Sequence, residues 1–296
     1  MRGYLERVRR LSNKAAAPLT GILIALLLIA VPASAGIKSA GGFKYVSKAF
    51  ELPRSTSQDG KFKRYKAKCP RGTSVVGGGE RNDSSFDQVR MAQTYPIDDG
   101  DKNKKPEDGW GVLLQNVADA KHQGDVFAIC GKARAVYVSE NLDVAGGNQD
   151  QDDINCPEGL STSMGGIRGH RLLFQNAGAP IGSEYFSYYA DNYDSVTRTV
   201  KGTAICVPYE TQYASFQGAD TVPARSRSLR EAECPAGTHV IGGGQSNSGV
   251  FDFYASSQFP SAPSGPPDRY WSVVVENLDE SFDHLSDVVA TCAPTQ

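Results

Sequence analysis

The feature that most constrains the fold is an internal repeat marked by six cysteines. Three of them precede a proline and open a segment, and three end a short apolar run and close it. The opening segments read CPRGTSVVGGG (69–79), CPEGLSTSMGG (156–166) and CPAGTHVIGGG (234–244), and the closing cysteines are Cys130, Cys206 and Cys292. The same signals recur in the same order, which is the signature of a repeat architecture.

Two further signals recur in each repeat. A tyrosine begins the repeat, and an aromatic residue precedes an asparagine by six positions before the closing cysteine. The tyrosines are Tyr45, Tyr137 and Tyr213; the aromatic–asparagine pairs are Trp110 with Asn116, Phe186 with Asn192 and Trp271 with Asn277. We therefore divide residues 36–296 into units of about 43–133, 134–209 and 210–296, packed as one domain without flexible linkers.

The local pattern within each unit indicates β-structure. Apolar and polar residues alternate around each aromatic–asparagine pair, as in 110–116 and 271–277, which is typical of a half-buried strand. Turn-rich stretches separate such runs, and we expect no large helix after residue 35. The prediction is an all-β protein of three tandem repeats with four or five strands each. Pseudo-threefold packing, like a β-prism, would also remove exposed sheet edges.

The first 35 residues resemble a secretory signal peptide. A basic stretch (1–14) precedes an apolar run (19–31), and Ala33-Ser34-Ala35 forms a small-residue cleavage site. An uncleaved anchor is the alternative, but this run is shorter than the about 20 residues of a membrane span. No later run is long enough to cross a bilayer. We expect a secreted, extracellular protein without a transmembrane segment.

Export to an oxidising compartment favours three disulfides over metal ligation by the cysteines. Six cysteines allow several connectivities, and the repetition favours the one that is identical in every unit. The predicted pairs are Cys69–Cys130, Cys156–Cys206 and Cys234–Cys292.

The charge distribution argues against a nucleic-acid partner. Five of the 31 Lys and Arg residues lie in the leader, so the exported part is mildly acidic. Basic residues crowd before Cys69, over 61–68, whereas the matching place before Cys156 is acidic, over 150–153. A solvated face is the simplest interpretation. Pairing between units and a patch for an anionic surface polymer are the alternatives.

These motifs together resemble repeats of exported bacterial proteins whose function is unassigned. The resemblance covers essentially all of residues 43–292, and it implies neither an activity nor functional residues. The three Cys-Pro-x-Gly units are also distantly similar to the β-prism of vitelline membrane outer layer protein I, which implies a three-sheet prism as a plausible shape.

An aromatic residue at the same position of each repeat suggests a set of side chains that stack on sugar rings. Trp110 and Trp271 would stack on a carbohydrate, with Asn116 and Asn277 as polar partners. In the alternative, the aromatic residue lies in the core of its unit and the asparagine closes a turn. The glycine triplets lack the context of a phosphate loop and indicate a bulge or close approach between sheets.

Metal and catalytic signals are weak. Asp99 with Asp101, and Asp150 with Asp152, have the spacing of oxygen ligands in calcium loops, but lack the glycine and glutamate of an EF-hand. Calcium is therefore the one candidate cofactor. The four histidines show no zinc-ligand or triad pattern, and we assign no catalytic residue.

The sequence thus predicts a non-catalytic binding or surface module. Carbohydrates, as glycans or cell-surface polymers, are the leading ligand class, since repeated β units offer multivalent shallow sites. A structural or envelope-associated protein without a small ligand is the alternative. An exported hydrolase is the third hypothesis, and it requires His170 or His239 to meet a nucleophile and an acid in a cleft.

Overall fold

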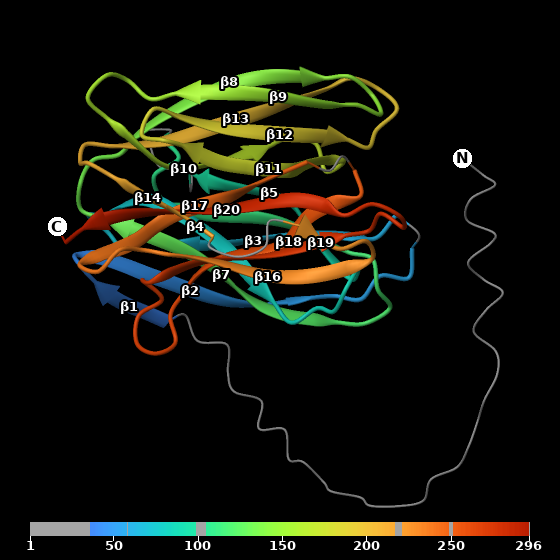
Figure 1. Cartoon of the computed structure of the whole chain (residues 1–296), viewed down its shortest axis with the longest axis horizontal. Helices are drawn as coiled ribbons and strands as arrows, with labels where there is room; N and C mark the ends of the chain where they lie inside the picture. The colour runs from blue at the N-terminus through green and yellow to red at the C-terminus, as the bar shows by residue number, and fades with distance from the viewer. Residues whose placement is uncertain (1–35, 58, 99–104, 217–220, 249–250, 296) are drawn as a thin grey trace, which may run out of the picture. The chain divides into compact units, whose positions relative to one another are not determined.

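A computed structural model of the chain describes residues 36–57, 59–98, 105–216, 221–248 and 251–295. Every regular element in these ranges is a β-strand, so the all-β prediction is confirmed (Figure 1). The predicted signal peptide, 1–35, lies outside the described residues. Within the described ranges no helix has the length and apolarity needed to span a membrane.

Each unit contributes two antiparallel sets of three strands, and some of these sets join a set of a neighbouring unit in a larger sheet. In unit 1, the first, last and third strands form the set β2-β7-β4, and the other three form β3-β6-β5. The strands of unit 1 are β2 (Phe43–Leu52), β3 (Lys61–Lys68), β4 (Ser74–Asn82), β5 (Val89–Ile97), β6 (Gly109–Asn116) and β7 (His122–Gly131). An extra strand, β1 (Gly36–Ala40), pairs with β2.

Units 2 and 3 repeat this arrangement with the strand sets β8-β13-β10, β9-β12-β11, β14-β20-β17 and β16-β19-β18. Pairing of β4 with β18 and of β11 with β17 makes two seven-stranded sheets, each of which spans two units. The strands of unit 2 are β8 (Val136–Val144), β9 (Gln149–Asn155), β10 (Ser161–Arg168), β11 (Leu173–Ile181), β12 (Tyr185–Asn192) and β13 (Arg198–Val207). Those of unit 3 are β14 (Gln212–Ser215), β15 (Thr221–Val222), which pairs with β20, β16 (Ser226–Glu233), β17 (Thr238–Asn247), β18 (Phe253–Ser261), β19 (Tyr270–Asn277) and β20 (His284–Pro294).

The units have more strands than the four or five expected, because the charged segments before each opening cysteine are strands. Five of the eight residues of β3 are basic, so β3 does not alternate as a half-buried strand does. It pairs with β6 on one side and ends its sheet.

Each predicted disulfide is formed, which confirms the connectivity. The Cα atoms are 5.7 Å apart in Cys69–Cys130, 5.7 Å in Cys156–Cys206 and 5.6 Å in Cys234–Cys292. All three closing cysteines are fully buried. On the chain-entropy model each bridge stabilises its unit by about 3–4 kcal/mol.

Every pair of units is joined through a glycine on the strand that follows the opening cysteine. A Cβ atom at Gly79 (β4) would lie 1.9 Å from the carbonyl oxygen of Gln258 (β18). At Gly166 (β10) it would lie 1.9 Å from that of Thr94 (β5), and at Gly244 (β17) 1.9 Å from that of Gly178 (β11). The predicted close approach of strands at these glycines is confirmed. The units thus contact one another in cyclic order, and a true pseudo-threefold axis stays a prediction.

One methionine explains why the middle opening segment departs from the pattern. Gly77 and Gly242 face backbone carbonyls of a neighbouring unit, where a Cβ would be 2.1 Å from Ile241 O and 2.5 Å from Ser163 O. The matching residue of unit 2 is Met164, which is 1% exposed. Its Sδ atom accepts the N–H of Gly78 at 3.3 Å. In unit 2 a methionine side chain therefore stands where units 1 and 3 have glycine, and it contacts the backbone of unit 1.

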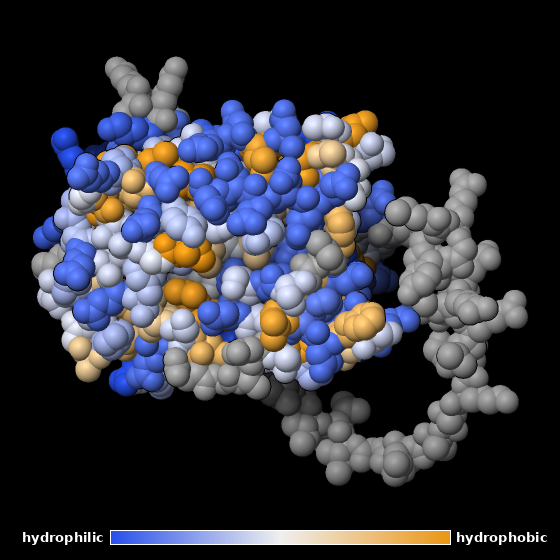
Figure 2. Space-filling view, turned by 45° about the horizontal axis from the view of Figure 1, so that its top comes forward, coloured by the Kyte–Doolittle hydropathy of each residue, from blue (hydrophilic) through white to orange (hydrophobic). Residues whose placement is uncertain are grey.

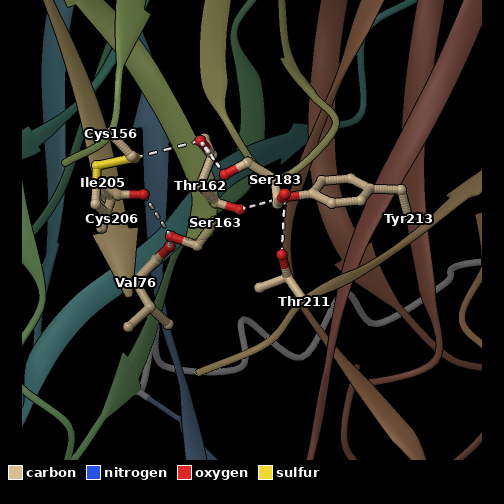
Figure 3. The surroundings of a disulfide bond; sticks show 9 residues. All are labelled: Val76, Cys156, Thr162, Ser163, Ser183, Ile205, Cys206, Thr211 and Tyr213. Atoms are coloured by element: carbon tan, nitrogen blue, oxygen red, sulfur yellow. Dashed lines mark hydrogen bonds between the residues drawn. A yellow bond between two sulfur atoms is a disulfide. The ribbon is translucent and has the colours of Figure 1, made fainter. Parts of the chain in front are cut away.

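The repeat tyrosines join the units by hydrogen bonds, which we call the tyrosine clasps. Each hydroxyl donates to a carbonyl that lies six residues after the opening cysteine of another unit. The bonds run from Tyr45 to Val240 (2.8 Å), from Tyr137 to Val75 (2.7 Å) and from Tyr213 to Thr162 (2.7 Å). Figure 3 shows the third clasp beside the Cys156–Cys206 disulfide, with Thr211 Oγ1 2.8 Å from the Tyr213 hydroxyl. Burial raises the pKa of Tyr213 to about 12, so the phenol remains a donor.

We expect Tyr213→Phe to lower the free energy of unfolding by about 1–2 kcal/mol, because the Thr162 carbonyl loses its donor while the ring still packs. Urea unfolding followed by tryptophan fluorescence measures this change. Tyr185→Phe, on β12 and outside the clasps, is the control. Equal stability of the two variants would show that the clasp contributes nothing.

Candidate functional site

The predicted sugar-stacking aromatics lie in the core. Trp110 and Trp271 are both 0% exposed, and each indole packs against a glycine of its own unit, Gly78 and Gly243. The Trp110 indole also donates to Thr94 Oγ1 at 2.6 Å. A sugar cannot reach either ring in this structure. The stacking hypothesis is therefore corrected in favour of the core alternative.

The repeat asparagines close turns, as that alternative expects. Asn116 and Asn277 are fully buried. The Asn116 amide donates to the carbonyls of Pro53 (3.0 Å) and Ala120 (2.7 Å), and its oxygen accepts the N–H of the residue two positions later, at 2.8 Å. Asn192 and Asn277 make the same three contacts in their units. Their polar groups are thus used within the fold, and they do not form a ligand site.

The aspartates predicted as possible calcium ligands lie either outside the described residues or on a strand. Asp99 and Asp101 lie outside the described residues. Asp150 and Asp152 are on β9, an extended strand, where each carboxylate accepts the next residue's N–H at 2.9 Å. In the described part of the chain, no three His, Cys, Asp or Glu side chains are grouped so that they could hold a metal ion.

One of the two histidines named for the hydrolase hypothesis meets both an acid and a hydroxyl. His239 Nδ1 is 2.8 Å from Asp268 Oδ2, and Nε2 is 3.2 Å from Thr295 Oγ1. The imidazole also lies against Gly41, where a Cβ would be 2.0 Å from its Cδ2. These contacts tie the turn after β1 and the residue after β20 to β17, which carries His239. The nearby cleft described below is lined by Pro267 but not by His239 or Thr295. His170 lies 3.8 Å from Asp194.

Buried carboxylates lie where a turn of one unit packs on the sheet of the next. Glu276 Oε2 accepts the N–H of Asp87 at 2.6 Å, and Asp191 Oδ2 accepts that of Phe251 at 3.3 Å. Asp87 and Phe251 have φ angles of 54° and 59°, so these carboxylates bind left-handed turn residues. Burial raises the pKa of both carboxyls. They hold the units together and are not available to a ligand.

A surface cleft of about 230 Å³ lies between units 1 and 3 and is the candidate site. Strands β1, β2 and β7 and the end of β4 form one wall, and the end of β18 with the following loop (262–267) forms the other. Its lining includes Lys38, Tyr45, Ser47, Arg81, Asp125, Phe127 and Ser261. Lys38 Nζ donates to the Gly265 carbonyl at 2.9 Å and so links the two walls.

The charged and aromatic side chains at the cleft contact one another. Arg81 Nη2 is 3.1 Å from Asp125 Oδ2, and these side chains are 56% and 29% exposed. The Arg81 guanidinium lies 5.8 Å from the centre of the Phe259 ring. Phe259 in turn stacks on Phe127, with ring centres 6.3 Å apart. Both rings are buried, with exposed fractions of 7% and 9%. The cleft therefore presents a partly exposed ion pair backed by buried aromatic side chains, which suits a polar ligand.

Sequence reasoning missed this site, although a repeat signal for it exists. Arg81 and Arg168 stand twelve residues after their opening cysteines, and Ser246 occupies the third place. An aromatic-proline pair recurs on the neighbouring unit, as Tyr95-Pro96 and Phe259-Pro260. Arg168 lies over Tyr95 at 5.3 Å, as Arg81 lies over Phe259. The partners are on different units, so alignment within units does not reveal the pairing.

The outer strands carry opposite charges. All five basic residues of β3 are exposed, and β9 has three aspartates, of which Asp150 and Asp153 are exposed. Glu140 and Asp143 on the neighbouring strand β8 extend the acidic surface. Figure 2 shows a largely hydrophilic surface on the side of the molecule where β8 and β9 lie.

No protein-family model matches this sequence, and no curated protein shows significant similarity to it.

Proposed function

We propose that this chain is an exported, non-catalytic binding module that takes a carbohydrate in the cleft between units 1 and 3. The observation that supports the proposal best is the partly exposed Arg81–Asp125 ion pair that lines this cleft. Guanidinium and carboxylate groups form charge-assisted hydrogen bonds with the hydroxyl groups of a sugar.

The rigidity of the fold suits such a role. Three disulfides and the contacts between units fix both walls of the cleft before a ligand arrives, which reduces the entropic cost of binding. A single shallow cleft predicts weak binding to one sugar, and a polymeric ligand would gain affinity through avidity where several protein copies bind it.

The test is binding of the disulfide-bonded protein to an array of glycans and cell-wall polymers. We expect saturable binding that Arg81→Ala weakens about ten- to hundredfold, since a hydrogen bond to a charged group contributes about 1.5–3 kcal/mol. Arg168→Ala is the matched control, because Arg168 occupies the same repeat position and also lies over an aromatic ring. A blank array, or binding that Arg81→Ala leaves unchanged, would contradict the proposal.

A structural or envelope-associated role is the second candidate. The opposite charges of β3 and β9 favour it, because exposed sheet edges of opposite sign are suited to assembly.

A further inference from the structure

We propose that copies of this chain associate head to tail, with the basic edge strand β3 of one molecule against the acidic edge strand β9 of the next. Both strands end their sheets: among the residues that the structure describes, β3 pairs only with β6, and β9 only with β12. Their outer edges therefore present backbone groups that a further strand can pair with.

The charges of the two strands are complementary. β3 carries Lys61, Lys63, Arg64, Lys66 and Lys68, all exposed, and β9 carries Asp150, Asp152 and Asp153. The contrast extends to the units: unit 1 has sixteen Lys and Arg against twelve Asp and Glu, and unit 2 has five against nine. Electrostatic complementarity of this kind steers association and fixes orientation.

Charged edges usually protect a sheet from aggregation, because equal charges repel. This protection blocks contact of β3 with β3 and of β9 with β9, but it favours contact of β3 with β9. The two strands do not pair within one molecule, since they lie at the ends of two different sheets. The contact must therefore join two molecules, and a contact between two different surfaces continues into chains unless it closes into a ring.

A second copy is a better occupant of β3 than an anionic polymer, because it accounts for both edges at once. A polyanion would use β3 alone and would leave the acidic surface of β8 and β9 without a role. Neither strand lines the cleft between units 1 and 3, so association and ligand binding are separate properties.

The test is the molar mass of the full chain with its disulfides formed, measured by analytical ultracentrifugation over a range of protein and salt concentrations. At low salt the mass should rise with protein concentration. The apparent dissociation constant should increase about tenfold or more towards 0.5 M salt, where exposed charges are screened beyond a few ångströms. A protein that stays monomeric at every concentration at low salt would overturn the proposal.

Two charge-reversal variants identify the surfaces. Lys61→Glu with Lys63→Glu and Arg64→Glu leaves β3 with three Glu against two Lys and makes it acidic, and Asp150→Lys with Asp153→Lys leaves β9 with two Lys against one Asp and makes it basic. Each variant alone should be monomeric, because its two edges then have the same sign. An equimolar mixture should associate again, since each edge of one variant meets an edge of opposite sign on the other. Failure of the mixture to associate, or association of either variant alone, would show that β3 and β9 are not partners.

Discussion

Replacing Gly244 by alanine is expected to prevent folding, or to lower the free energy of unfolding by more than about 4 kcal/mol. The new Cβ would lie 1.9 Å from the carbonyl oxygen of Gly178. The clash is between two backbones, so no side-chain rotation relieves it, and β17 and β11 must separate. Gly79→Ala and Gly166→Ala should behave alike, because each meets a carbonyl oxygen at the same distance.

The measurement is the yield of disulfide-bonded protein together with its denaturant midpoint. Gly131→Ala is the matched control, since it also lies in a strand and its Cβ would meet Phe43 and Val76 at an ordinary 3.4 Å. We expect this control to remain within about 1 kcal/mol of the native protein. Near-native stability of Gly244→Ala would show that the units are not joined as described.

The free energy of unfolding is expected to decrease as the pH rises from about 4.5 to about 8, because Glu80 is buried without a cation of its own. The side chain is 0% exposed, and desolvation raises its pKa from 4.5 to about 8. Hydrogen bonds from Asn82 and Ser257, and the charge of Arg227, only partly oppose this shift. Between these pH values the folded chain holds a proton that the unfolded chain releases, so stability is greatest at the acidic end and is lost on titration.

The loss attributable to Glu80 is at most about 4 kcal/mol, since each pH unit in this interval corresponds to about 1.4 kcal/mol. Glu80→Gln should raise stability at pH 8 and flatten the profile, as urea unfolding at several pH values would show. The profile should keep part of its slope, because burial also raises the pKa values of Glu276 and Asp191. Glu231→Gln, on an exposed side chain, is the control. A profile that Glu80→Gln leaves unchanged would contradict this account.

The sequence predicted the features that depend on contacts within one unit. The disulfides follow from repetition, since Cys69 and Cys130 stand at the same places in their unit as the other two pairs. Trp110 lies on the apolar side of an alternating strand, and its burial was one of two expected outcomes. The turn-closing role of Asn116 was likewise predicted by its place at the end of that strand.

Contacts between units were harder to predict, because a repeat alignment places equivalent residues above one another and not the residues that touch. Tyr213 bonds to a carbonyl of unit 2, and Arg81 lies over a ring of unit 3. The strand β3 was also missed, because an edge strand with five basic residues lacks the apolar alternation by which strands are recognised. The two walls of the candidate cleft come from different units, so the cleft was missed for the same reason.

The cyclic contact of the units delays complete folding until the last strands of the chain are present. Unit 1 is joined to unit 3 by Gly79 and Tyr45, so its edges have no partner until strands near the opposite end of the sequence exist. A chain that emerges from its amino terminus must therefore wait for β17 to β20 before any unit is fully covered. We expect one late, cooperative transition in which all three units become protected from hydrogen exchange together. A fragment ending after unit 2 should remain open and prone to aggregation.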